Sequence, residues 1–236
     1  MRALLVRIGA DQSEGGGWWN GPVNSITCEF TYVPIPETKA LHPGFEKPFT
    51  LVEGPLLSFG KCLPSALQNM NMHLDPDFAH LTYGDQGERA KQIRSKLSND
   101  DLLVFYAALA DINPARRLTY AIIGLYVIDT IVDATAVQRS QWDDNAHTRR
   151  ALEDGATDIV VRAKPGKSGR LRRCMPIGEF RERAYRVTQP LLQCWGGLSA
   201  KNGFLQRSAR LPEIFNAHAF YSWFTKQQPI FLASNN

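Results

Sequence analysis

The sequence predicts an α+β fold, a small mixed β-barrel with flanking helices and long surface loops. Two apolar runs, Leu102 to Leu109 and Leu118 to Ile128, lie on either side of the turn-rich segment 110–117. β-Branched and aromatic residues dominate the second run, and Asn113-Pro114 marks the break between the two. We therefore expect adjacent, buried strands that pair antiparallel and form the heart of the barrel.

The N-terminal elements follow from local periodicity. Residues 2–9 (RALLVRIG) predict a short buried strand, and residues 26–32 predict a strand with one buried face. Residues 86–98 predict an amphipathic helix that leads into the central strands. The apolar positions concerned are Ile26, Cys28, Phe30 and Tyr32 in the strand, and Ala90, Ile93 and Leu97 in the helix.

The C-terminal part contains three further predicted elements. Ile159 to Val161 are expected to form a short buried strand, and the arginines at 181, 183 and 186 are expected to lie on a helix. Residues 211–224 have apolar side chains at near-helical spacing and predict a helix packed on the barrel.

Length and composition are those of an ordinary globular protein. With 236 residues, 44% of them hydrophobic and 21% charged, the chain is long enough to bury a substantial core. We expect one elaborated domain over 1–236, with a barrel core at about 1–175 and a helical extension at about 176–236. No apolar run approaches the roughly 18 to 20 residues that span a membrane. We therefore expect no membrane partner. The N-terminus lacks a signal-peptide pattern and is expected to begin with a strand.

Cysteine spacing indicates the compartment. Cys28, Cys62, Cys174 and Cys194 are widely separated and include no CxxC pair, which fits neither a zinc ribbon nor a small disulfide framework. We expect free thiols in a reducing environment, and therefore a cytoplasmic protein.

Charge is distributed unevenly along the chain. Residues 145–236 contain 15 basic and 6 acidic residues, whereas residues 1–144 contain 12 and 17. A basic half favours a polyanionic partner, and DNA or RNA is the first expectation. Exposed basic side chains that serve solubility alone are the alternative.

A glycine-rich segment near the N-terminus is the first candidate ligand-binding loop. Gly15 to Gly17 are followed by Trp18, Trp19 and Asn20, and Asp11 precedes them. The tryptophans are suited to stacking on a base, and Asn20 or Asp11 to binding its polar edge. A wide surface turn whose tryptophans pack into the core is the competing interpretation.

Polar residues concentrate between positions 72 and 85. Two patterns stand out, the Asp-Pro-Asp at 75–77 and the later Asp85. The segment is typical of turn or helix capping, which we favour, while nucleotide contact and metal ligation are alternatives. No HExxH pattern is present, and we expect neither a metal ion nor another cofactor. The residues concerned are His73, Asp75, Asp77, His80 and Asp85.

Two isolated positions complete the candidate site. Glu37 follows the rigid Pro-Ile-Pro exit, where its carboxylate is expected to contact a base edge or a cation, or to cap a turn. Asn145 and His147 form an Asn-x-His after the central strands, and His147 is the histidine best suited to acid–base chemistry. A histidine satisfied by its structural neighbours is the alternative.

The densest basic run follows the predicted strand at 159–161. A Gly-Lys-Ser at 166–168 suggests a P-loop, but the required first glycine falls on Val161, which rejects that motif. A flexible basic loop that contacts phosphates without reading sequence remains, with a solvated hairpin turn as the alternative. The candidate phosphate-binding residues are Arg162, Lys164, Lys167, Arg170, Arg172 and Arg173.

The central strand pair resembles the PUA-like barrels, particularly the EVE and ASCH groups. In those barrels a Gly-Asp opens the first strand, and a later strand carries a glycine followed by a valine. Here Asp101 takes the place of the strand acid, while Asp100 replaces the usual glycine before it, so the start of the strand is expected to differ. The other matching positions are Phe105, Tyr106, Gly124 and Val127.

A longer resemblance, over most of residues 1–175, is to the third nucleotide-modification-associated domain family. It rests on the Asp-x-x-x-Gly-Gly stretch at 11–16, the Pro-Ile-Pro-Glu at 34–37, the Asp-Pro-Asp at 75–77, the strand pair and the Asn-x-His at 145–147. The resemblance implies a protein that handles modified nucleotides or nucleic acid, either binding a modified base or helping to make one. No catalytic roles are carried over from it.

Three functional hypotheses follow. In the first, the chain binds a modified or flipped base in DNA or RNA. Trp18 or Trp19 stacks on the base, Asn20, Asp85 or Asn145 reads its edge, and the basic run holds phosphates. In the second, it is an enzyme acting on a nucleotide or nucleobase, with His147 as acid or base beside Asp75, Asp85 or Glu37. In the third, its basic face binds an acidic protein. The sequence leaves open whether the chain is an enzyme.

Overall fold

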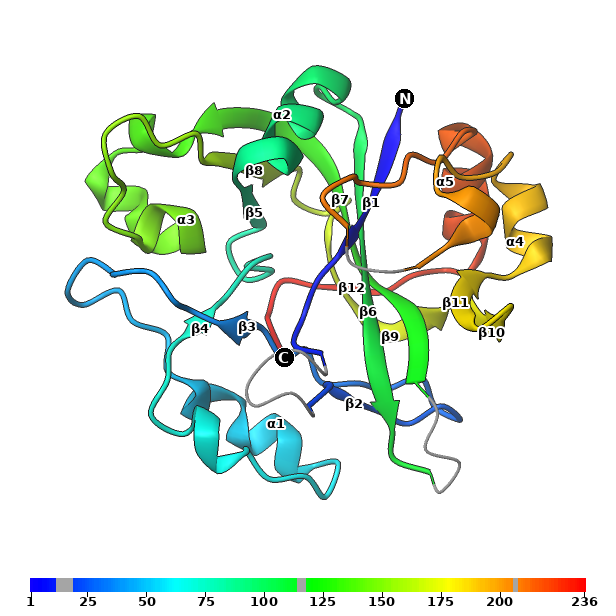
Figure 1. Cartoon of the computed structure of the whole chain (residues 1–236), viewed down its shortest axis with the longest axis horizontal. Helices are drawn as coiled ribbons and strands as arrows, with labels where there is room; N and C mark the ends of the chain where they lie inside the picture. The colour runs from blue at the N-terminus through cyan, green and yellow to red at the C-terminus, as the bar shows by residue number, and fades with distance from the viewer. Residues whose placement is uncertain (12–18, 114–117, 206–207) are drawn as a thin grey trace.

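The computed structural model describes residues 1–11, 19–113, 118–205 and 208–236. Its centre is a mixed sheet in which eight strands are paired, with helices and hairpins arranged around it (Figure 1). Hydrogen bonding follows the order β1-β6-β7-β8-β5, while β2 pairs with β6, β9 with β7, and β12 with β9. The strands are β1 (Ala3–Arg7), β2 (Pro22–Val23), β5 (Thr82–Asp85), β6 (Leu102–Asp111), β7 (Leu118–Asp133), β8 (Ile159–Ala163), β9 (Gly169–Pro176) and β12 (Phe231–Leu232).

The long strands β6 and β7 pair antiparallel, as their apolar runs predict. Their register begins at Leu102 opposite Val127, ends at Ala110 opposite Leu118, and contains one irregularity after Phe105. The 16-residue β7 is long enough to serve two further partners: its first half pairs with β9 and its second half with β8. β1 runs parallel to β6 on the other side.

Both faces of the sheet are buried. Successive residues of each strand point to opposite faces, so neighbouring residues belong to different hydrophobic clusters. Leu4, Val6 and Phe105 belong to one hydrophobic cluster. Leu5 and Val104 belong to the other. On the first face the cluster includes Ala90 and Ile93 of α2 (Gly87–Lys96), and on the second it includes Phe220 and Phe224 of α5 (Ala217–Lys226). The helix α2 confirms the prediction at 86–98. The helix α5 confirms only the second half of the helix predicted at 211–224, because residues 212–214 pair with β1 instead.

Short elements connect and cover the sheet. Two separate two-stranded pairs are formed by β3 (Ile35–Pro36) with β4 (Met72–His73), and by β10 (Gly178–Arg181) with β11 (Ala184–Val187). The remaining helices are α1 (Glu53–Leu57), α3 (Ala146–Arg149) and α4 (Gln189–Cys194), with 3₁₀ turns at Phe49–Val52, Ser65–Leu67, Ala134–Ala136, Arg139–Asp144 and Lys201–Gly203. None of the helices in the described ranges has the length and apolar character needed to cross a membrane.

The predicted α+β class with a mixed sheet is confirmed, but the described strands do not close into the predicted barrel. Within the described residues, no strand pairing joins β1 and β5, which end the hydrogen-bonded path. The outer edge of β1 pairs instead with the segment 212–214, since Leu5 N–H donates to Pro212 O at 2.8 Å and Ile214 N–H donates to Ala3 O at 3.0 Å. This C-terminal segment occupies the edge that a closing strand would need.

Two predicted elements are wrong. Residues 26–32 are not a strand, because the Asn24 side chain accepts from the N–H of Ile26 at 3.0 Å and turns the chain, leaving Ile26 exposed. Residues 181–186 are a hairpin and not a helix. Its two-residue turn is Glu182-Arg183, both with positive φ (52° and 62°), which matches the left-handed turn geometry that joins tight hairpins. The region after 175 therefore contributes strands as well as helices.

Candidate functional site

A small cavity of about 110 Å³ lies at the junction of β1, β5, α2 and α3. Its walls come from five separate stretches of the chain, at residues 7–9, 35, 73–75, 83–89 and 147. The volume corresponds to roughly three or four waters at liquid density. It is therefore suited to an ion with its waters or to the reacting part of a larger ligand.

Three buried side chains face one another in this cavity, and we call them the central triad: His73, Asp75 and His147. The Nε2 of His147 lies 3.7 Å from Asp75 Oδ2, and the Nε2 of His73 lies 3.9 Å from the same oxygen. All three ligand atoms fall within 4.8 Å of one another. These distances exceed those of hydrogen bonds, so the three groups converge on a shared point without bonding directly.

Glu37 fixes His73 from behind. The Nδ1 of His73 lies 2.7 Å from Glu37 Oε2, and Arg150 donates to both carboxylate oxygens at 3.0 and 2.9 Å. Burial opposes ionisation of Glu37, but hydrogen bonds from His73 and Arg150 outweigh it and lower the Glu37 pKa to about 2. Burial also lowers the pKa of His73 to about 4, so the imidazole is neutral at pH 7.

Asp158 and Asn145 fix His147. The Nδ1 of His147 lies 2.5 Å from Asp158 Oδ1, and the Asn145 side chain accepts from the N–H of His147 at 2.8 Å. Asn145 is thus the N-cap of α3, and its Nδ2 donates to Asp75 at 3.1 Å. The Asn-x-His pattern therefore positions two members of the central triad together.

Asp75 is the buried acid of the central triad. Its carboxylate accepts from the N–H of Gly84 at 2.8 and 3.0 Å and from Asn145. Burial raises its pKa to about 7, against the opposing effects of His147 and these hydrogen bonds. The capping interpretation holds for Asp77, whose Oδ1 accepts from the N–H groups of Ala79 and His80 at 3.1 and 3.3 Å.

A polar rim surrounds the mouth of the cavity. Arg89 pairs with Asp85 at 3.0 Å and donates to the Tyr83 hydroxyl at 2.9 Å, and this hydroxyl also donates to Asp85. On the β1 side, Arg7 pairs with Asp11 at 3.1 Å. Two guanidinium groups therefore line the cavity beside the central triad.

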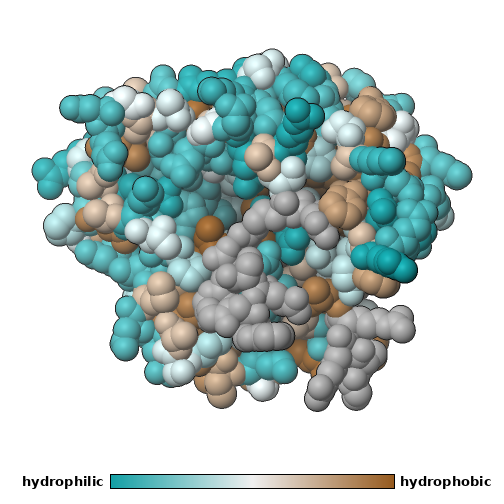
Figure 2. All heavy atoms as spheres, in the orientation of Figure 1, coloured by the Kyte–Doolittle hydropathy of each residue, from teal (hydrophilic) through white to brown (hydrophobic). Residues whose placement is uncertain are grey.

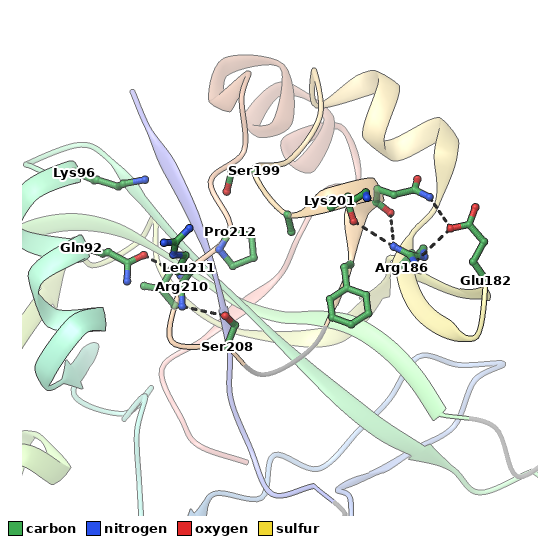
Figure 3. A pocket seen from close by; sticks show the side chains of 13 residues that line it. Gln92, Lys96, Glu182, Arg186, Ser199, Lys201, Ser208, Arg210, Leu211 and Pro212 are labelled. Atoms are coloured by element: carbon green, nitrogen blue, oxygen red, sulfur yellow. Dashed lines mark hydrogen bonds and ion pairs between the residues drawn. The ribbon is translucent and has the colours of Figure 1, made fainter.

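A larger groove of about 810 Å³ is shaped by α2, the hairpin β10–β11 and residues in the ranges 199–204 and 208–212. Figure 3 shows Gln92 and Lys96 of α2 on one side, with Lys201 and Arg186 on the other. A small recess is lined by Arg7 and Arg89 of the cavity together with Ser208 to Pro212 of the groove, so the two spaces adjoin. The molecular face in Figure 2 is largely hydrophilic, with apolar side chains scattered over it.

The structure brings together only part of the residue set that the sequence predicts. Asp75, Asp85 and His147 line one cavity, and Glu37 and Asn145 support it from behind. Asn20 does not line this cavity. It is buried and donates to Ala108 O at 2.9 Å, while Trp19 packs against the core. Trp18 lies outside the described residues.

The basic run at 162–173 occupies β8, a turn and β9. Arg162 donates to Gln141 at 2.9 Å, and Lys164 pairs with Asp100 at 2.7 Å. Arg170 is buried with its guanidinium 5.2 Å from the Phe30 ring centre, and burial lowers its pKa to about 10. The exposed members are Lys167, Arg172 and Arg173.

The sequence assigns some residues of the site a different main role and others no role. For His73 it favours capping, with nucleotide contact and metal ligation as alternatives. The local pattern groups His73 with capping residues, yet the spacing His73-x-Asp75 at an extended segment places both side chains on one face. Asp158 carries a local signal, as an acid directly before a predicted strand. Arg7 and Arg89 carry none, because only the pairing of β1 with β6 and the docking of α2 bring them to the rim.

Comparison of the chain with family models finds a match over most of its length. The family described as nucleotide modification associated domain 3 matches residues 2–195. The chain belongs to the nucleotide modification associated domain 3 family. No curated protein and no solved structure matches it.

The region that matches the nucleotide modification associated domain 3 family includes the site. The matched region contains the central triad, its supporting residues Glu37 and Asp158, and both arginines of the rim. It ends at Trp195, before the residues of 199–204 and 208–212 that line the groove. The cavity thus lies within the part of the chain that the family model covers.

Proposed function

We propose that this chain binds a nucleotide unit of DNA or RNA, with the reacting or modified part of the nucleotide in the cavity and its phosphates in the groove. The observation that carries the proposal is that the cavity and the groove are neighbours, since a recess between them is lined by Arg7 and Arg89 of the one and by Ser208 to Pro212 of the other. The cavity alone is too small for a whole nucleotide, and the adjoining groove supplies the room and the charge. Association with nucleotide modification supports the choice of ligand.

The charges of the groove suit a polyanion. Among the described residues, Lys201 and Arg210 form no ion pair, while Lys96 and Arg186 pair with Glu213 and Glu182 at 2.8 and 3.4 Å. Two cations are therefore available to phosphates without breaking an existing pair. Such contacts release counterions and make binding strongly salt-dependent.

Charge reversal can distinguish phosphate binding in the groove from phosphate binding along the exposed arginines of β9. Binding of a fluorescently labelled single strand is measured by anisotropy across a salt series, for the wild type, Lys201→Glu/Arg210→Glu, and Arg172→Glu/Arg173→Glu on β9. Log K falls as log salt rises, and loss of two phosphate contacts in the groove should make this fall less steep by about 1.4, at roughly 0.7 for each contact. The β9 variant is the matched control of equal charge. Absence of binding at low salt, or equal binding by the groove variant, would contradict the proposal.

Two finer expectations belong to this proposal. The likeness of the β6–β7 pair to the PUA, EVE and ASCH barrels supports recognition of a modified or flipped base. The four free cysteines support a cytoplasmic location, where thiols remain reduced.

Catalysis on the bound nucleotide is the second candidate function. The pairing of His147 Nδ1 with Asp158 favours it, because a carboxylate that holds one imidazole nitrogen directs the other toward the cavity. Nucleoside analysis by mass spectrometry, after incubation with nucleotides and nucleic acid, tests this function. Turnover lost by about 10²–10⁴-fold in His147→Gln would support it, and unaltered nucleosides under all conditions would contradict it.

A further inference from the structure

The central triad has the donor set and the spacing of a metal site. Two imidazole nitrogens and one carboxylate oxygen lie within 4.8 Å of one another. An ion bonded at about 2.0–2.2 Å to each donor requires donors roughly 3–3.5 Å apart. The two separations between imidazole and carboxylate, 3.7 and 3.9 Å, therefore need to contract by less than about 1 Å, and all three donor atoms already lie within 4.8 Å of one another.

Each donor is held in the orientation that coordination needs. Glu37 and Asp158 occupy the Nδ1 atoms of His73 and His147, which leaves both Nε2 atoms facing Asp75. A carboxylate behind a histidine is the usual outer arrangement of metal-binding histidines, because it fixes the tautomer and the ring orientation. That both histidines carry one is the independent observation that points to an ion.

A purely hydrogen-bonded triad accounts poorly for this geometry. In such a network one histidine would donate from Nε2 to Asp75 at hydrogen-bond distance, yet both nitrogens lie farther away. Among the described residues, the ion-pairing groups within 4.0 Å of the Asp75 carboxylate are these two histidines. A cation between the three groups would compensate the buried carboxylate.

We propose that His73, Asp75 and His147 bind one divalent first-row transition metal ion. The proposal goes beyond nucleotide binding and does not depend on it. Two nitrogens and one oxygen select zinc, iron, manganese or cobalt over magnesium and calcium, which prefer oxygen ligands. Three protein ligands beside an open cavity leave coordination positions for water or a substrate atom, which is typical of catalytic and not of structural metal sites.

The assignment also redefines His147. Its Nε2 is a ligand to the ion in this proposal, so the nitrogen is not available as a general base. Asp158 and Glu37 are positioning residues, since they act on the ion through the histidines and do not touch it.

The test uses the tag-free full chain, stripped with a chelator and titrated with Co²⁺, Zn²⁺, Mn²⁺ and Mg²⁺. We expect one transition ion per chain, a visible Co²⁺ absorption spectrum that reports nitrogen and oxygen ligands, and no Mg²⁺ binding at matched concentration. Asp75→Asn and His73→Gln should weaken Co²⁺ binding by more than about 100-fold, and Asp158→Asn by about 10–100-fold.

Matched controls keep the test independent of folding. His80→Gln removes a histidine from the same segment without touching the triad, and it should bind Co²⁺ as the wild type does. Circular dichroism of each variant identifies any that fail to fold, in which case the milder Asp158→Asn decides. No ion bound to the wild type, or equal Co²⁺ affinity in wild type and Asp158→Asn, would overturn the proposal. Oligonucleotide binding measured in chelator tests the proposed function separately, because it does not require the ion.

Discussion

Gly84 lies against the imidazole of His147 so closely that a side chain at position 84 would overlap the ring atoms Cγ and Cδ2. The same glycine donates its N–H to Asp75, so its backbone reaches two members of the central triad. The site therefore requires a glycine at position 84 of β5.

Gly84→Ala should destabilise the protein by about 1–3 kcal/mol, because a methyl group must displace His147 or Asn145. Gly54→Ala is the control, since position 54 lies in α1 with open space around it, and it should be neutral or slightly stabilising. Urea denaturation measures both. Equal stability of the two variants would show that the packing around His147 is loose.

The side chain of Asn235 holds the segment that follows Asp75. It accepts from the N–H of Phe78 at 2.7 Å and donates to Asp77 at 3.0 Å. Asn235→Ala removes both hydrogen bonds and should lower the free energy of unfolding by about 1–3 kcal/mol, because the Phe78 N–H and the Asp77 carboxylate lose a partner. Ser234→Ala, next to it, should change stability by less than about 0.5 kcal/mol. An equal effect of both changes in thermal unfolding would contradict this role.

Asp100 adopts φ of 67°, the left-handed conformation in which glycine carries no penalty. The PUA-like barrels have a glycine at this position, before the strand acid. Asp100 replaces that glycine here, but the backbone keeps the left-handed conformation that a glycine would adopt. Asp100→Gly should raise the unfolding temperature by about 1–4 °C, and Asp100→Val should lower it. Differential scanning calorimetry decides, and a stabilising valine would refute the conformational argument.

His80 should make stability depend on pH. Its hydrogen bond to Asp77 raises its pKa above 6.5, helped by the charges of Asp77 and Asp144 and opposed by burial and Arg149. Because the folded-state pKa is the higher one, this stabilisation is complete below about pH 6.5 and is lost as pH rises through the folded value. The side chain is partly exposed, so the effect should be less than about 1 kcal/mol.

The measurement compares unfolding free energies at about pH 5.5 and about pH 8.5 in the wild type and His80→Gln. The difference between the two pH values should be smaller in the variant. A difference of the same size in both proteins would remove His80 as its source.

The sequence could predict those elements whose signal is local. Two long runs of β-branched and aromatic residues predict β6 and β7, and spaced apolar residues predict α2 and α5. The hairpin β10–β11 is mistaken for a helix because arginines carry no strand signal, and its turn depends on positive φ at Glu182 and Arg183. The open sheet is missed because the pairing of 212–214 with β1 joins residues about 200 positions apart.

The site could be predicted only in part for the same reason. Asn145, His147 and Asp75 stand in short patterns that draw attention to polar groups, and they meet in the cavity. The pairing of His73 with Glu37, which turns a turn-forming segment into a candidate metal site, spans 36 residues and has no local signal.

The most direct test of the account is a crystal structure of the protein soaked with a nucleoside monophosphate and Mn²⁺. We predict the ion between His73, Asp75 and His147, with the nucleotide beside it and its phosphate in the groove against Lys201 or Arg210. Nucleotide density confined to the exposed arginines of β9, with neither ion nor nucleotide in the cavity, would contradict the account.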